Sequence, residues 1–223
     1  MKKGNLIIIG KNSFIGSSLY NFLRNKKKIK ILSFIEFMNL DKKIISNYDY
    51  VCNCAVNKNY IKKNNNLSYD YDLIISKKIK EINVNYIFLS SRKVYKPGFN
   101  ITEKNKIQPI DKYSKNKLVT EKLLKKYLKS KLLILRISNV IGLKRNKSPR
   151  KVHKTFFDNY LNIMKKKGIL KFHDLYKDFI SIDQLSRIFD LILQKKYFGT
   201  YNVSLGQKVY MSEILDWLNC RNR

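Results

Sequence analysis

A tyrosine and a lysine four positions apart, Tyr113 and Lys117, are the residues of this sequence best suited to proton transfer. Residues with this spacing project from one face of a helix, so the two side chains are expected to be neighbours. A phenol is a weak base near neutral pH, but a nearby ammonium favours its ionised form. Taken alone, the pair is more typical of a solvated helix face in a lysine-rich chain.

A strand, a tight loop and a helix start are predicted within residues 6–16, whose sequence is LIIIGKNSFIG. Gly10 can make the sharp turn, Gly16 can let the helix lie close to the strand, and the first helical amides can hold a pyrophosphate. The side chain of Ser13 must then fit inside the loop, or its hydroxyl must replace a contact with the phosphate. A plain strand-to-helix turn is the alternative.

Short apolar runs alternate along the chain with stretches of helical periodicity, which predicts parallel strands joined by helices in a doubly wound α/β fold. The expected strands are residues 6–9, 29–34, 50–52, 86–89 and 132–137, and the first expected helices lie around 14–23 and 118–128. After Gly142 this regular alternation of apolar runs and helical stretches ends. A helix is expected at 156–164, a strand at 178–182, a helix at 185–192 and a short strand at 201–203.

Several segments together resemble the NAD-dependent epimerase/dehydratase family of extended short-chain dehydrogenases/reductases. The glycine loop ends in Phe14-Ile15-Gly16, although Ser13 stands where the family has its middle glycine. The other matching segments are YIFLSSRKVY at 86–95, ITE at 101–103, Pro109, LRISNVIG at 135–142 and KDFISID at 177–183. The resemblance implies a Rossmann-like NAD(P)-binding core over residues 1–142. Residues 143–223 would form a small, shortened C-terminal substrate lobe with segments that return to the core.

The resemblance also implies a site. Its catalytic residues would be Ser91, Tyr113 and Lys117, with Ser90 as an alternative to Ser91. The residues implied for binding NAD or NADP are Gly10, Ser13, Phe14, Ile15, Gly16, Ser33, Asn39, Leu40, Tyr113 and Lys117. Those implied for binding the substrate, a nucleotide-linked sugar, are Ser91, Asn139 and Lys177, with Lys177 in place of the family's arginine.

The resemblance implies hydride transfer in which Tyr113 exchanges the substrate proton. Family members that eliminate water carry an Asp-Glu pair after the serine, whereas this chain has Arg92-Lys93. We therefore expect 4-epimerisation or reduction of a keto-sugar rather than dehydration. A non-catalytic NAD(P)-binding regulatory protein of the same fold is the alternative, because Ser13 and Lys177 depart from the family pattern. The direction of the reaction, the sugar and the choice between NAD and NADP stay open.

Composition limits the other classes of function. The 47 basic and 16 acidic residues give a net charge of +31, but the lysines run along the whole chain, so compositional bias explains the charge better than a nucleic-acid site. Three cysteines and two histidines suggest neither a disulfide framework nor a metal site. No apolar run is long enough to span a membrane. We expect a cytoplasmic protein, and the family resemblance implies a homodimer through the helix that begins at Tyr113.

Overall fold

A six-stranded parallel sheet forms the centre of the computed structural model, which describes residues 4–63, 67–142 and 176–221. The strands lie in the order β2-β1-β3-β4-β5-β9, and every neighbouring pair is parallel. Their bounds are Ile29–Leu32 (β2), Leu6–Ile9 (β1), Tyr50–Asn53 (β3), Asn85–Ser91 (β4), Leu132–Ile137 (β5) and Gly199–Val203 (β9). The predicted doubly wound α/β fold is confirmed.

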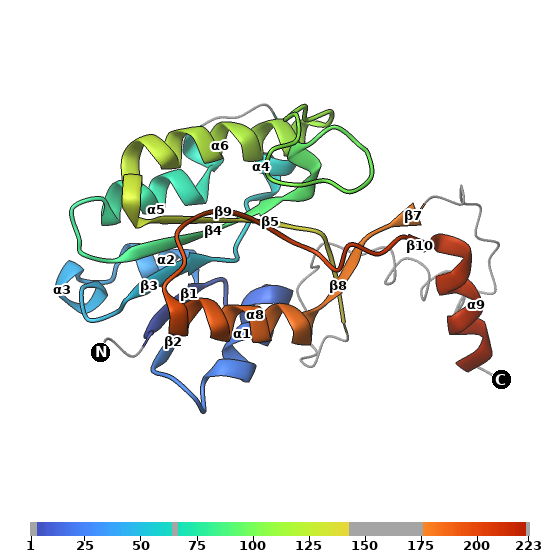
Figure 1. The fold of residues 1–223 in the computed structure, drawn as a ribbon. Helices are drawn as coiled ribbons and strands as arrows, with labels where there is room; N and C mark the ends of the chain where they lie inside the picture. The colour runs from blue at the N-terminus through green and yellow to red at the C-terminus, as the bar shows by residue number, and fades with distance from the viewer. Residues whose placement is uncertain (1–3, 64–66, 143–175, 222–223) are drawn as a thin grey trace.

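Helices cover both faces of this sheet (Figure 1). On one face lie α1 (Phe14–Leu23) and α8 (Ile182–Lys195). On the other lie α2 (Phe34–Met38), α3 (Lys42–Ile45), α4 (Lys58–Lys62), α5 (Tyr71–Ile79) and α6 (Lys112–Leu128). A strand between two helical layers is buried on both sides, which explains why the strands read as continuous apolar runs.

The central strand β1 shows how the two cores divide. Leu6 and Ile8 belong to the core beneath α1 and α8, whereas Ile7 and Ile9 belong to the core beneath α2, α3, α5 and α6. Successive side chains of a strand point to opposite faces, so four adjacent apolar residues supply both layers. All four are fully buried.

Smaller elements lie beyond the carboxyl end of the sheet (Figure 1). Two short pairs of strands form there: β6 (Asn139–Ile141) pairs in parallel with β8 (Phe179–Ser181), and β7 (Tyr176–Lys177) pairs antiparallel with β10 (Val209–Tyr210). The last helix, α9 (Met211–Arg221), packs through Met211 and Ile214 against Phe179. The strand β9, which the sequence predicts after residue 142, returns to the edge of the main sheet.

The sequence predicts the strands of the main sheet, the strand β8 and the long helices well, but it misses the short helices α2 to α4, the helix α5 and the small strands β6, β7 and β10. The helix expected at 156–164 lies outside the described residues. The division of the chain at residue 142 stays a prediction. Within the described ranges, no helix combines the length and the apolar character that a membrane span requires.

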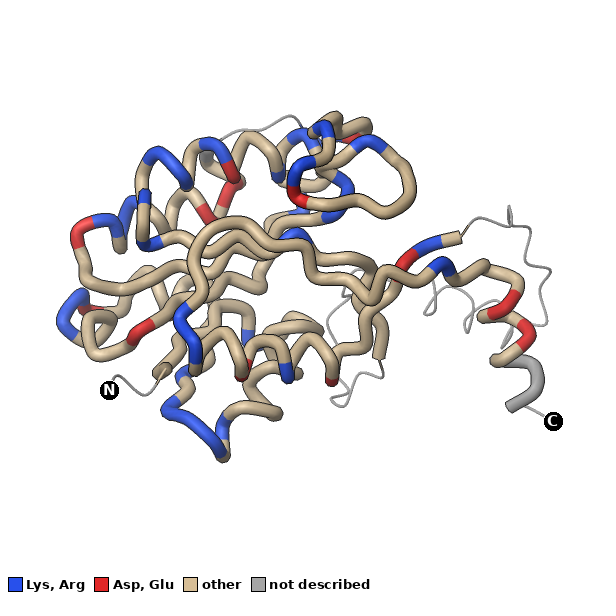
Figure 2. Tube along the Cα trace, in the orientation of Figure 1, with Lys and Arg blue, Asp and Glu red and all other residues tan. Residues whose placement is uncertain are grey.

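Lysines and arginines are spread over the outer surfaces of the helices and loops (Figure 2). The net charge of +31 is thus distributed over many elements of the described chain. This distribution agrees with the interpretation of the charge as compositional bias.

Candidate active site

The loop between β1 and α1 has the backbone that the sequence predicts for a phosphate loop. Gly10 has φ +117°, a conformation that side chains disfavour. A Cβ atom at Gly16 would lie 2.6 Å from the carbonyl oxygen of Gly10, so only glycine lets the start of α1 approach this closely. The first amides of α1 have no backbone acceptor within the helix, and those of Phe14 and Ile15 have no hydrogen-bond acceptor among the described residues, so they could bind an anion there.

Ser13 fits inside the loop as the N-cap of α1. Its Oγ accepts a hydrogen bond from the Gly16 amide at 2.9 Å, and its own amide donates to the Gly10 carbonyl at 2.9 Å. The side chain therefore turns toward the helix start and satisfies one of its amides. This geometry answers the steric question raised by a serine at this position, because the loop closes without displacing Gly10 or Gly16.

The loop lies where a doubly wound sheet binds ligands. The chain leaves β1 toward β2 on one side and later forms β3 on the other side, so the order of the strands reverses at β1. Ligands bind at such a switch point, outside the carboxyl ends of the strands. Gly10 follows β1 there, and Cys54 follows β3.

A cleft opens at this edge of the sheet. Of the residues predicted for the phosphate loop, Ile15 lines this cleft, whereas Gly10, Ser13, Phe14 and Gly16 do not. Ser91, Tyr113 and Lys117 all line it, although they come from the end of β4 and from the first turns of α6. The other lining residues are Ile15, Asn53, Cys54, Ala55, Val56, Asp72, Leu89, Ser90, Ile137, Ser138 and Val140. The tertiary structure thus brings the three residues into one cavity.

Tyr113 and Lys117 are neighbours on α6, as their spacing predicts. The helix begins after Asp111, whose carboxylate accepts a hydrogen bond from the Ser114 amide at 2.7 Å. The Lys117 ammonium lies 5.9 Å from the centre of the Tyr113 ring, and its residue is only 4% exposed. Burial of this lysine argues against the alternative of a solvated helix face.

The two serines at the end of β4 have different partners. Ser90 donates a hydrogen bond to Oε1 of the buried Glu121 at 2.5 Å. Ser91 instead accepts a hydrogen bond from the Lys93 amide at 3.3 Å, which leaves its hydroxyl hydrogen for a ligand in the cleft. These contacts favour Ser91 over Ser90 as the serine that meets the substrate.

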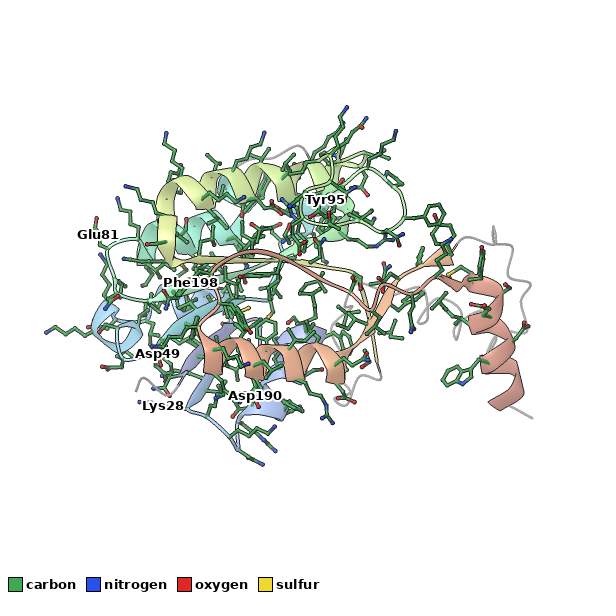
Figure 3. The ribbon with its side chains drawn as sticks, viewed as in Figure 1. Lys28, Asp49, Glu81, Tyr95, Asp190 and Phe198 are labelled. Atoms are coloured by element: carbon green, nitrogen blue, oxygen red, sulfur yellow. The ribbon has the colours of Figure 1, made fainter. Side chains whose placement is uncertain are left out.

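Glu121 also anchors α6 to the sheet. Arg136 of β5 donates to both of its carboxylate oxygens, at 3.0 and 2.6 Å, and to the Tyr95 hydroxyl at 2.7 Å. Tyr95 in turn donates to Asn202 of β9 at 2.9 Å. Figure 3 shows Tyr95 near the carboxyl end of the sheet, away from Glu81, which lies toward the amino end of β4. The network fixes the strand ends that carry the site.

Lys117 faces a buried carboxylate on α5. Its Nζ lies 3.9 Å from Oδ2 of Asp72, and both side chains are nearly inaccessible, at 5% and 8% exposed. Burial raises the pKa of Asp72, whereas the Lys117 ammonium and hydrogen bonds from Tyr86 and Asn53 oppose that rise. Burial and the charge of Asp72 raise the pKa of Asp70, the N-cap of α5, to about 6.

One buried polar atom of the cleft has no partner. The Ser138 hydroxyl lies just after β5, its residue is 7% exposed, and it finds no hydrogen-bond partner among the described residues. A buried hydroxyl without a partner costs free energy, so a ligand that reaches it gains a hydrogen bond. The glycine cradle, this hydroxyl and the Tyr113–Lys117 pair fit the requirements of a dinucleotide, whose pyrophosphate the amides at the start of α1 would hold.

Other residues predicted to contact the cofactor do not line the cleft. Ser33 caps α2 through the Glu36 amide, Asn39 ends α2 on the surface, and Leu40 packs against the core on that side of the sheet. They lie beside the phosphate loop, because the Gly10 amide donates to Leu32 at the end of β2. Glu36 joins the two segments through an ion pair with Lys11 at 2.5 Å, which lowers the pKa of Glu36 to about 2.

The residues predicted to bind the substrate lie toward the small strand pairs. Asn139 donates its side-chain amide to the carbonyl of Asp178 at 2.8 Å, which ties β6 to β8. Lys177 lies half-buried on β7, where burial and the charges of Arg92 and Lys93 lower its pKa. A group of three cations therefore gathers on this side of the site.

Sequence reasoning missed Ser138 and the role of Asp72 as a neighbour of Lys117. The position of Ser138 directly after an apolar strand is a signal that could have identified it, because residues there reach the carboxyl edge of the sheet. No local pattern connects Asp72 with Lys117, which lies 45 positions later, since their contact depends on how α5 and α6 pack.

Comparisons with known proteins agree with this geometry. The model of the NAD dependent epimerase/dehydratase family matches residues 6–204. A comparison with curated proteins found no match.

Solved structures with the same fold include a UDP-N-acetylglucosamine 4-epimerase from Methanobrevibacter ruminantium, with 22% identity, a TM-score of 0.80, and coverage of 99% of this chain and 82% of that one. A UDP-glucuronic acid 4-epimerase from Bacillus cereus, in complex with NAD, has 18% identity, a TM-score of 0.79, and coverage of 98% and 84%. A dTDP-glucose 4,6-dehydratase from Bacillus anthracis, also with NAD, has 14% identity, a TM-score of 0.74, and coverage of 97% and 80%.

The family model extends from β1 to the residue after β9, and so includes the phosphate loop, Ser91, Tyr113 and Lys117. The expectation of NAD or NADP as cofactor accords with the description of the family as NAD dependent. The chain belongs to the NAD dependent epimerase/dehydratase family.

Proposed function

We propose that this protein catalyses hydride transfer between a nicotinamide nucleotide and a nucleotide-linked sugar, as a 4-epimerase or a keto-sugar reductase. The observation that carries the proposal is the cleft lined by Ser91, Tyr113 and Lys117 together with Ile15, which lies at the start of the helix that follows the glycine loop. Structures of the same fold include 4-epimerases of UDP-sugars, which supports this class of substrate.

When bound, the nicotinamide nucleotide supplies the acceptor or donor of hydride. Tyr113 takes the proton of the sugar hydroxyl on its phenolic oxygen as the carbon-bound hydrogen leaves with its electron pair, and a carbonyl forms. Ser91 donates a hydrogen bond to the reacting oxygen. Lys117 would present its positive charge to Tyr113, 5.9 Å from the centre of the ring, and would hold the nicotinamide ribose. The reverse steps reduce the carbonyl, from the opposite face in an epimerase.

The residues after Ser91 favour epimerisation or reduction over dehydration. Elimination of water needs a side chain that removes a proton from carbon and another that protonates the leaving hydroxyl. Arg92 and Lys93 occupy the positions that follow Ser91, and neither offers a carboxylate. Arg92 and Lys177 instead place two positive charges on this side of the site, beside Lys93 with its partner Asp111, and these charges would suit the diphosphate of a nucleotide sugar.

A homodimer through α6 stays a prediction. Val119 is an exposed apolar residue on this helix, and the exposed positions around it are lysines: Lys112, Lys115, Lys122, Lys125 and Lys126. Two copies of this face would repel each other at low ionic strength, so a dimer built on α6 should be favoured by added salt. Light scattering at two salt concentrations tests this directly. Cytoplasmic localisation also stays a prediction.

The proposed reaction is tested with the whole chain. NAD and NADP are first titrated by calorimetry, and UDP-, dTDP- and GDP-hexoses are then assayed by mass spectrometry and by absorbance of the reduced nicotinamide. An epimerase converts the sugar without net change of the cofactor, a reductase consumes the reduced cofactor in stoichiometric amounts, and a dehydratase product would lack one water. Loss of water from a hexose would contradict the exclusion of dehydration.

Tyr113→Phe is the decisive variant, because the ring still packs and only the proton-transferring hydroxyl is gone. Turnover should fall about a hundredfold to ten-thousandfold, with cofactor affinity nearly unchanged. Thermal denaturation with and without NAD verifies that the variant is folded. A folded Tyr113→Phe protein with full turnover would refute the role of Tyr113. A wild-type protein that binds NAD and turns over none of the sugars would favour the regulatory alternative.

A further inference from the structure

Asp72 is a buried charge at the site to which the mechanism above gives no role. Its Oδ2 faces the Lys117 ammonium at 3.9 Å. Its Oδ1 accepts hydrogen bonds from the Tyr86 hydroxyl at 2.6 Å and from the Asn53 side-chain amide at 3.0 Å. Asp70, not Asp72, caps α5, so capping of the helix does not account for the second carboxylate.

We propose that Asp72 is a positioning residue that acts through Lys117, holding its ammonium at the base of the cleft and setting the pH range in which Tyr113 exchanges its proton. This inference rests on the proposed function of Tyr113 and Lys117. Asp72 touches neither the reacting atoms nor Tyr113 in the contacts described above, so its effect on the reaction is indirect.

The environment of Lys117 explains why it needs a counter-ion. Its ammonium lies 4.5 Å from the centre of the Phe88 ring and 5.4 Å from that of Tyr60, and the residue is 4% exposed. Aromatic faces attract a cation but do not replace the water that it has lost. A carboxylate anchored by two hydrogen bonds compensates this charge at a fixed position.

The same carboxylate weakens the effect of Lys117 on Tyr113. An isolated ammonium in a buried cleft strongly favours a neighbouring phenolate, because charges interact over several ångströms where water is excluded. When the ammonium is paired with Asp72, the pair itself carries little net charge. Removing the charge of this carboxylate should therefore leave more uncompensated positive charge beside Tyr113.

Other titratable groups surround this pair. From the neighbouring elements, the groups that face Asp72 or Lys117 are Cys52 of β3, Tyr60 of α4, Asp70 before α5, Tyr86 of β4 and Tyr113 of α6. Burial raises the pKa of Cys52, Tyr60 and Tyr86 above its ordinary value, so these three groups stay neutral near pH 7. Among these groups, the charges near pH 7 are therefore those of Lys117, Asp72 and Asp70.

Asp72→Asn tests the proposal in the protein without substrate. Asparagine has nearly the same volume, and its side-chain oxygen can still accept the hydrogen bonds from Tyr86 and Asn53, so the change removes mainly the charge. The readout is the pH midpoint of Tyr113 ionisation, followed by NMR of ring-labelled tyrosine and assigned with Tyr113→Phe. We expect the midpoint to fall by about one pH unit.

Asp111→Asn is the matched control, because it removes a carboxylate two positions from Tyr113 that is 47% exposed and paired with Lys93. Asparagine also caps helices well, so α6 should keep its start. Solvent screens this charge, and the midpoint of Tyr113 should change by less than about 0.3 units. An unchanged or raised midpoint in Asp72→Asn, or equal shifts in both variants, would overturn the proposal.

A second measurement applies if circular dichroism shows that Asp72→Asn is unfolded. The carboxyl resonance of Asp72 is then titrated in the wild-type protein and in Lys117→Met. Loss of the ammonium should raise the Asp72 midpoint by one unit or more, and the absence of a rise would equally overturn the proposal. Neither titration depends on turnover, so failure of the proposed reaction and failure of this inference are told apart.

Discussion

The Ser138 hydroxyl allows a test in which stability and binding should change in opposite directions. In the protein without ligand it is buried and unpartnered among the described residues. An unsatisfied buried hydroxyl costs about 1–3 kcal/mol, whereas removing its oxygen leaves only a very small void. Ser138→Ala should therefore increase the free energy of unfolding by about 1 kcal/mol, which corresponds to a rise in Tm of roughly 2–4 °C.

Binding should weaken in the same variant. If a ligand in the cleft bonds to Ser138, alanine removes that bond and leaves a polar group of the ligand without a partner. The cost of about 1.4 kcal/mol corresponds to a tenfold increase in Kd. Calorimetric titration with NAD, followed by a UDP-sugar added to the NAD-saturated protein, identifies which of the two ligands loses the contact.

Ser186→Ala provides the control for both measurements. Ser186 is also buried, at 1% exposed, but its hydroxyl donates to the Ile182 carbonyl at 2.7 Å within α8. Because the Ser186 hydroxyl already has a partner, Ser186→Ala should not increase the free energy of unfolding. It should also leave the affinities for NAD and for the UDP-sugar unchanged. The reasoning about Ser138 is refuted if Ser138→Ala destabilises the free protein, or if neither NAD nor the UDP-sugar binds more weakly.

Three further changes test other parts of the molecule. Asp70→Asn should flatten the pH dependence of stability. The pKa of Asp70 rises from 3.8 to about 6 on folding, so the free energy of unfolding of the wild-type protein falls as pH increases through this range. Relative to wild type, the variant should therefore be up to about 3 kcal/mol more stable at pH 7 than at pH 4, as measured by denaturant titrations. Gly16→Ala should cost roughly 1–3 kcal/mol in thermal unfolding, because its Cβ would meet the Gly10 carbonyl at 2.6 Å, whereas Gly98→Ala, with its nearest atom at 3.9 Å, should be nearly neutral. Lys117→Met should weaken NAD binding in calorimetry as well as turnover, unlike Tyr113→Phe, and equal NAD affinity would contradict its placement at the nicotinamide ribose.

Local patterns determined the main elements and the phosphate loop. The strand β1 is four apolar residues long, and such a run bounded by glycine is typical of a strand buried on both faces. The loop followed from the positions of Gly10 and Gly16, because the backbone conformation at one and the close approach at the other exclude a side chain. The pairing of Tyr113 with Lys117 also followed from helical geometry alone.

The arrangement of the site depended on contacts between distant segments, which only the tertiary structure decided. The family resemblance implies Ser91 with Ser90 as the alternative, and only the fold shows that Ser90 is bound to Glu121, which the packing of α6 against β4 brings to it. The counter-ion of Lys117 and the unpartnered hydroxyl of Ser138 belong to α5 and to the end of β5, and nothing in either segment alone indicates such a role. Spacing along the chain fixes neighbours within one element, whereas the charge and hydrogen-bond partners of a buried side chain are set by whichever elements the fold packs around it.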